Sequence, residues 1–139
     1  MTLAKELQPT LTELLEWVAE GLIEEVDGRL PNEAVGLLCE DGTILSLINQ
    51  ARSPDRFEVS NRLVHEAITE AVDRGYHPLA IYHSHPTKDS WPSKRDDVMM
   101  ELLAEVPFVI VGIDGIAAWM WEDGETRFIT KVERYGWDT

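Results

Sequence analysis

The stretch that decides the fold runs from residue 79 to residue 96 and reads LAIYHSHPTKDSWPSKRD. Its first part, residues 79–83, is a short and mostly apolar run that is typical of a buried strand. Side chains two apart on a strand point to the same face, so we expect His83 and His85 to lie side by side at the strand end. Pro86 restricts His85 to an extended backbone and turns the chain away. The sequence therefore predicts two neighbouring imidazoles where a buried strand ends.

A helix that begins at Ser93 brings the chain back toward this strand end, with Asp96 in its first turn. Two histidines and one carboxylate leave a fourth tetrahedral position open for water, which is the ligand set of a catalytic zinc rather than a structural one. Each part also has a simpler interpretation: a lone His-x-His is usually no metal site, and Ser93 with Asp96 fits a capping box. The combination favours His83, His85 and Asp96 as metal ligands. Asp97 is an alternative to Asp96 if the helix register shifts.

The rest of the chain alternates between helical and strand-like patterns. Thr10 or Thr12 is a candidate cap of the first helix, an Asp41-Gly42 turn joins two apolar runs into a hairpin, and Ser60 is a candidate cap of the second helix. Upstream of the histidines we expect a helix over 10–26, hairpin strands over 34–39 and 43–48, and a helix over 61–74. Downstream we expect a helix from Ser93 to about residue 104, strands over 108–113, 116–121 and 127–132, and a tail over 133–139.

This order of elements predicts an α/β fold with a mixed β-sheet and helices on its faces. The length of 139 residues is that of one ordinary domain, so we expect residues 1–139 to form a single domain. Cys39, Tyr82, Trp119 and Trp121 are expected in the core or on a sheet face. His65 and His77 lie outside the motif and are expected on a helix face and in a turn.

The composition excludes several functions. The formal net charge is −14, and a polyanion such as nucleic acid or an anionic membrane is bound mainly through Lys and Arg. A single cysteine excludes an internal disulfide and any zinc site with two or more cysteine ligands, among them the zinc deaminases. The N-terminus lacks a basic region followed by an apolar run, and Pro107 and Gly112 interrupt the longest apolar stretch. We therefore expect a cytoplasmic protein that binds neither nucleic acid nor membrane.

The residues around the histidines also match a known family. His83-Ser84-His85-Pro86, five further residues, and then Pro92-Ser93-x-x-Asp96 resemble the JAMM signature of the JAB/MPN-domain metalloproteases, of the prokaryotic or phage stand-alone type. The family also has an upstream glutamate in a Glu-x-x-Gly-Leu context, and Glu33 stands in such a context here. The resemblance covers about residues 33–121. It implies the cytidine-deaminase-like fold of that family.

The resemblance also implies a mechanism. His83, His85 and Asp96 become the ligands of one zinc ion per chain, Glu33 the general base that deprotonates the attacking water, and Ser93 the donor to the oxyanion. The implied reaction is hydrolysis of a peptide or isopeptide bond after the Gly-Gly tail of a ubiquitin-like or sulfur-carrier protein. Our own hypothesis is that the extended tail adds as a strand beside the hairpin. Trp91, in the loop between the ligands, is a candidate substrate contact. The alternative is a non-catalytic zinc-containing binding or assembly module, for example in a phage tail.

Overall fold

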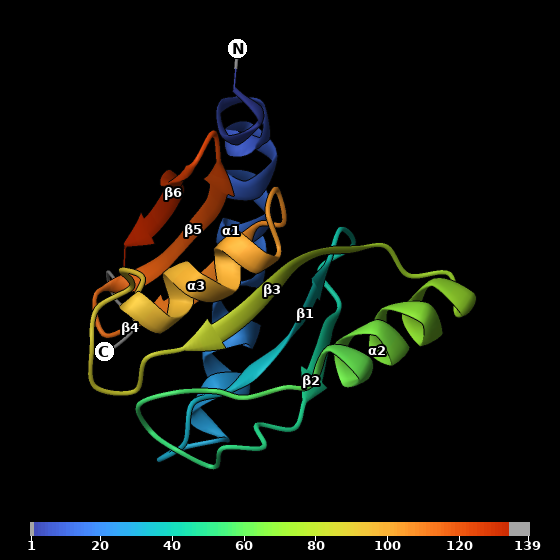
Figure 1. Cartoon of the computed structure of the whole chain (residues 1–139), viewed down its shortest axis with the longest axis vertical. Helices are drawn as coiled ribbons and strands as arrows, with labels where there is room; N and C mark the ends of the chain where they lie inside the picture. Colours follow the sequence, from blue (N-terminus) through green and yellow to red (C-terminus); the bar gives the residue numbers. More distant parts are fainter. Residues whose placement is uncertain (1, 134–139) are drawn as a thin grey trace.

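The computed structural model describes residues 2–133, and its helices and strands build one mixed sheet (Figure 1). Within that range the elements are α1 (Leu3–Asp27), β1 (Val35–Cys39), β2 (Ile44–Leu47), α2 (Asn61–Asp73), β3 (Pro78–Ser84), α3 (Lys94–Leu102), β4 (Phe108–Gly112), β5 (Gly115–Glu122) and β6 (Glu125–Glu133). The strand order is β2-β1-β3-β4-β5-β6. Only β3 and β4 run parallel among these neighbours, and α3 is the connection between them. The predicted α/β class with a mixed sheet is confirmed.

Helices cover both faces of the sheet, so the fold has three layers. The long α1 lies behind the sheet in Figure 1, whereas α2 and α3 lie in front of it. Alternating side chains on each strand enter two separate cores. On β3, Tyr82 packs toward α1, while Ile81 packs with residues of α2 and α3. His83 therefore faces the layer that contains α3, as the strand period predicts.

The first helix is longer than the sequence indicates. It begins at Leu3 with Thr2 as its N-cap, so the prediction of a start and a cap at Thr10 or Thr12 is wrong. The cause is a distant contact: the Glu122 carboxylate of β5 accepts hydrogen bonds from the backbone N–H groups of Leu3 and Ala4, at 2.6 and 3.3 Å. This side chain satisfies donors that a helix start otherwise leaves open, and the helix continues through Pro9.

The other predicted elements are found with shifted ends. The hairpin of β1 and β2 and the helix capped by Ser60 are confirmed. The helix after Ser93 ends at Leu102, and β6 includes Glu133, which was predicted to begin the tail. Residues 134–139 of that tail lie outside the described residues. Cys39 is a buried free thiol, and no helix in the described range is long and apolar enough to cross a membrane.

Candidate metal centre

The two histidines lie at the end of the central strand β3. His83 is fully buried and pairs in register with Val35 of β1 on one side and Ile110 of β4 on the other. His85 continues this line, because its backbone N–H donates to the Val111 carbonyl at 2.8 Å. The register also places Glu33, two residues before β1, beside the same strand end. Glu33 is 4% exposed.

The start of α3 brings Asp96 to the two histidines and Glu33. Ser93 is the N-cap, and its Oγ accepts from the Asp96 N–H at 3.2 Å, while the Asp96 Oδ2 accepts from the Ser93 N–H at 2.9 Å. The same carboxylate lies between the imidazoles, with Oδ1 3.1 Å from His83 Nε2 and Oδ2 3.0 Å from His85 Nε2. The capping box and the cluster with the histidines therefore coexist. Asp97 instead accepts a hydrogen bond from the Thr126 hydroxyl on β6, at 2.9 Å.

Two members of the cluster have polar atoms that are buried without a partner. Within the described residues, neither ring nitrogen of His83 has a hydrogen bond, and neither does Glu33 Oε1. The His83–Asp96 contact has the distance of an ion pair but lacks the alignment of a hydrogen bond. Buried polar groups are almost always satisfied, so these atoms call for a further partner.

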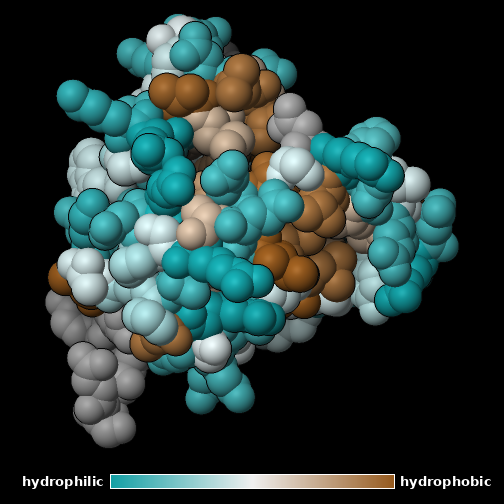
Figure 2. Space-filling view, turned by 60° about the horizontal axis from the view of Figure 1, so that its bottom comes forward, coloured by the Kyte–Doolittle hydropathy of each residue, from teal (hydrophilic) through white to brown (hydrophobic). Residues whose placement is uncertain are grey.

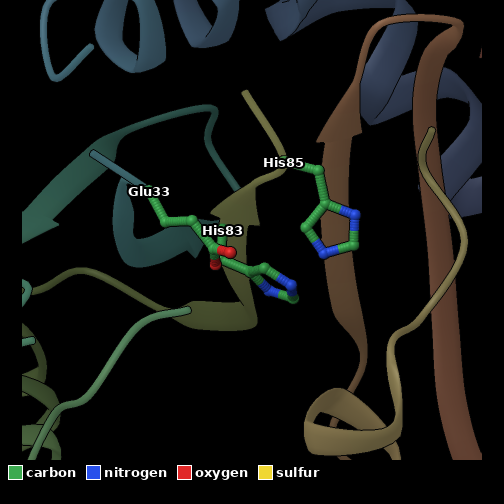
Figure 3. A group of neighbouring side chains, drawn as sticks. All are labelled: Glu33, His83 and His85. Atoms are coloured by element: carbon green, nitrogen blue, oxygen red, sulfur yellow. The ribbon is translucent and has the colours of Figure 1, made fainter. Parts of the chain in front are cut away.

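A metal ion fits this set of donors. Glu33, His83 and His85 each offer one ligand atom, and these atoms lie within 4.8 Å of one another. In Figure 3 the Glu33 carboxylate and the His83 ring lie close together at the end of the strand, and His85 approaches from the segment that follows. Imidazole nitrogens and carboxylate oxygens are the ligands of zinc in catalytic sites. Asp96, in contact with both rings, completes the donor set.

Burial and mutual charge shift the titration of these groups. Burial raises the pKa of Glu33 to about 8, and His85 opposes this rise only in part. Burial alone would raise the pKa of Asp96, but His83, His85 and the Ser93 N–H hold it well below its usual range. Burial lowers the pKa of His85, and the hydrogen bonds to Asp96 and to the Asp89 carbonyl outweigh this, so the pKa is raised. Such opposed shifts in one cleft are typical of functional sites.

A groove leads to the cluster between α3 and residues 55–59, in the loop before α2. It has a volume of about 370 Å³, and Ser93, Asp96 and Arg95 lie in its wall. Phe57 lines the groove and contacts the His83 ring, with ring centroids 4.7 Å apart. Nothing in the sequence indicated this contact between Phe57 and a histidine.

An apolar cavity of about 230 Å³ adjoins the groove and shares with it Phe57, Val59 and Met99. Figure 2 shows hydrophobic side chains gathered on the surface in the right half of this view. Val98 and Leu102 of α3 are among the exposed hydrophobic residues, at 59% and 74% exposure. Trp91 is also exposed and contacts the buried Trp119 in a tilted arrangement, with ring centroids 4.7 Å apart and an angle of 55° between the ring planes.

Comparison with known proteins agrees with this geometry. The family of prokaryotic homologs of the JAB domain matches residues 15–122. The chain belongs to this family. The JAB domain is 36% identical over 120 residues to a probable TtuB-protein conjugate cleaving protease of Thermus thermophilus, covering 81% of this chain and 80% of that protein.

The fold of the JAB domain also resembles a solved structure, that of protein DSY2949 from Desulfitobacterium hafniense. The TM-score is 0.65 at 23% sequence identity, with 79% of this chain and 84% of that chain covered. The family resemblance read from the sequence is thus confirmed, and so is the fold that it implied.

Proposed function

We propose that this JAB domain is a zinc-dependent peptidase or isopeptidase that cleaves conjugates of a ubiquitin-like or sulfur-carrier protein after their Gly-Gly tail. The observation that carries the proposal is the Asp96 carboxylate between two imidazoles, with the buried Glu33 beside them. Membership of the JAB family and the name of the Thermus thermophilus relative support the substrate class. We also propose that the protein acts in the cytoplasm.

In this proposal His83, His85 and Asp96 hold one zinc ion. Zinc in such a site lowers the pKa of a bound water toward about 7 and polarises the carbonyl of the scissile bond. The groove that Ser93 and Asp96 line would give water and substrate access to an ion held there. Asp96 is held by the backbone of the helix start, and His85 by the Asp89 carbonyl, so neither has to be ordered when the metal binds.

Glu33 is proposed as the general base and later the general acid. Its Oε1 is buried without a hydrogen-bond partner, so this oxygen is available to accept a proton from the attacking water. A cation close by favours the ionised carboxylate and counteracts the burial that raises its pKa. The same carboxyl group then delivers the proton to the leaving amine, because it remains within reach of the reacting atoms.

Ser93 is proposed to stabilise the oxyanion. Its Oγ accepts a hydrogen bond from the Asp96 N–H and therefore keeps its hydroxyl hydrogen for another acceptor. The side chain lies in the wall of the groove, next to the carboxylate that contacts both histidines. A hydroxyl donor at a developing oxyanion contributes roughly 3 kcal/mol in hydrolases with a comparable donor.

The groove between α3 and residues 55–59 is proposed to receive the substrate tail. Glycine has no side chain, so a Gly-Gly tail brings its backbone closer to the cluster than any other dipeptide. The Phe57 and Met99 side chains in the groove restrict its width. Replacing the tail by Ala-Ala is expected to prevent cleavage.

A conjugate of a ubiquitin-like sulfur-carrier protein, joined through its Gly-Gly carboxyl end to a lysine of a second protein, tests the proposal. The zinc-loaded chain is expected to release both proteins intact, which mass spectrometry detects. Glu33→Gln is expected to keep zinc and lose cleavage, with the exposed Glu20→Gln as the control. Absence of cleavage by the zinc-loaded wild type, with binding of the conjugate intact, would instead favour a binding or assembly module.

A further inference from the structure

One peptide unit connects the histidine cluster to the turn between β4 and β5, which lies at the same end of the sheet. His85 Nδ1 lies 2.7 Å from the carbonyl oxygen of Asp89. The N–H of the same peptide unit belongs to Ser90 and donates to Asp114 Oδ1 at 2.8 Å. Because a peptide unit is planar and rigid, the position of its N–H fixes the position of its carbonyl. His85 and Asp114 thus hold opposite ends of a single group.

The surroundings allow this peptide unit little freedom. A Cβ atom at Gly112 would lie 2.4 Å from the Asp89 carbonyl carbon and 2.4 Å from the Ser90 nitrogen, so the unit packs directly on the end of β4. Trp119 Nε1 donates to the Ser90 carbonyl at 2.9 Å, and Ser90 is fully buried. The loop after the second histidine is therefore fixed from the sheet side.

Asp114 is itself held in place. It precedes β5 in the turn between β4 and β5, and its Oδ2 lies 2.9 Å from Lys131 Nζ and 3.3 Å from the Ser90 hydroxyl. Gly112 and Gly115 pair across this turn and enclose Ile113 and Asp114. The bonds of Asp114 go to the loop that supports His85.

We propose that Asp114 is a positioning residue for the metal ligand His85, acting through the Asp89–Ser90 peptide. This inference rests on the proposed zinc site. A carboxylate that accepts from the Ser90 N–H polarises the peptide and makes the Asp89 carbonyl a stronger acceptor for the His85 Nδ1–H. That bond orients the ring and places the proton on Nδ1, which leaves Nε2 to bind the metal. Many zinc sites use a carboxylate bonded directly to the histidine; here a peptide unit lies between them.

The test compares zinc affinity, measured by competition with a chromophoric chelator, in the wild type and three variants of the whole chain. Asp114→Ala is expected to weaken zinc binding by about 10- to 100-fold. Asp114→Asn keeps an oxygen that accepts the Ser90 N–H. Its zinc affinity is expected to lie between those of the wild type and Asp114→Ala. The matched control is Asp41→Asn, since Asp41 also accepts a backbone N–H in a hairpin turn but lies at the other end of β1.

A second readout separates positioning from mere stabilisation. In the zinc-loaded protein the His85 Nδ1–H proton is expected to give a downfield NMR signal that exchanges slowly, and Asp114→Ala is expected to shift it upfield and speed its exchange. A purely structural role lowers the melting temperature while the signal and the zinc affinity of the folded protein stay unchanged, and that result would overturn the inference. Absence of zinc binding by the wild type would refute the proposed function and this inference together.

Discussion

Glu33→Gln should remove a pH dependence that this buried carboxyl group gives to the metal-free protein. The pKa of Glu33 is raised from 4.5 to about 8, mainly by burial. Between these values the folded chain retains a proton that the unfolded chain has released, so the free energy of unfolding falls as the pH rises. The contribution of Glu33 is fully present below pH 4.5 and is lost as the pH passes 8.

The size of this effect follows from the two pKa values. Each tenfold change in proton affinity is worth about 1.4 kcal/mol, which sets an upper limit of about 5 kcal/mol for the loss between pH 4.5 and pH 9. Relaxation and water entry around a buried charge reduce it, and we expect roughly 3 kcal/mol. The glutamine side chain of the variant cannot ionise, so the variant does not lose this stability as the pH rises. The variant should therefore match the wild type at pH 5 and exceed its stability at pH 9.

Urea unfolding of the chelator-treated proteins at pH 5, 7 and 9, followed by tryptophan fluorescence, measures this difference. Glu20→Gln is the control, because Glu20 is exposed on α1 and its replacement should give the same difference from the wild type at every pH. Zinc should reduce the pH dependence of the wild type, since a nearby cation stabilises the ionised carboxylate. A stability difference between Glu33→Gln and the wild type that stays constant from pH 5 to pH 9 would refute the electrostatic account of the site.

Two further substitutions test the site from its flanks. Ser93→Ala should keep zinc, lose about 0.5–2 kcal/mol of stability because its helix cap is removed, and cleave about 100-fold more slowly. A destabilised variant with full activity would show that Ser93 serves only as the helix cap. Gly112→Ala should cost about 1–3 kcal/mol and weaken zinc binding, because its Cβ meets backbone atoms of the loop that supports His85. The control is Gly21→Ala, because a Cβ at Gly21 makes only an ordinary contact at 3.8 Å and should not destabilise the protein. Equal melting temperatures and equal zinc affinities of the two variants would argue against the packing of Gly112 on the loop.

The cluster of His83, His85 and Asp96 could be predicted because each position depends on local rules. The strand period places the two histidines on one face, and the helix start at Ser93 fixes where Asp96 lies. Glu33 is different. Its place follows from the register of β1 on β3, where Val35 pairs with His83, and strand periodicity alone gives no register between strands. Only the family resemblance indicated Glu33.

The features that the sequence did not indicate all depend on long-range contacts. The first helix begins at Leu3 because Glu122, far along the chain, accepts its N–H groups. Asp114 falls between two expected strands, where the sequence indicated only a connection, so nothing indicated its bond to Ser90. Helix propensity and turn composition describe neighbours in sequence, whereas these side chains act on backbone brought near by the sheet.

The central claim is that the histidine cluster is a zinc site, and the zinc content of the purified protein tests it most directly. Elemental mass spectrometry should find about one zinc ion per chain in the wild type and in His77→Ala, whose histidine is exposed and far from the cluster along the strand, and almost none in His85→Ala. No zinc in the wild type after incubation with the metal, or equal zinc in His85→Ala, would contradict the account.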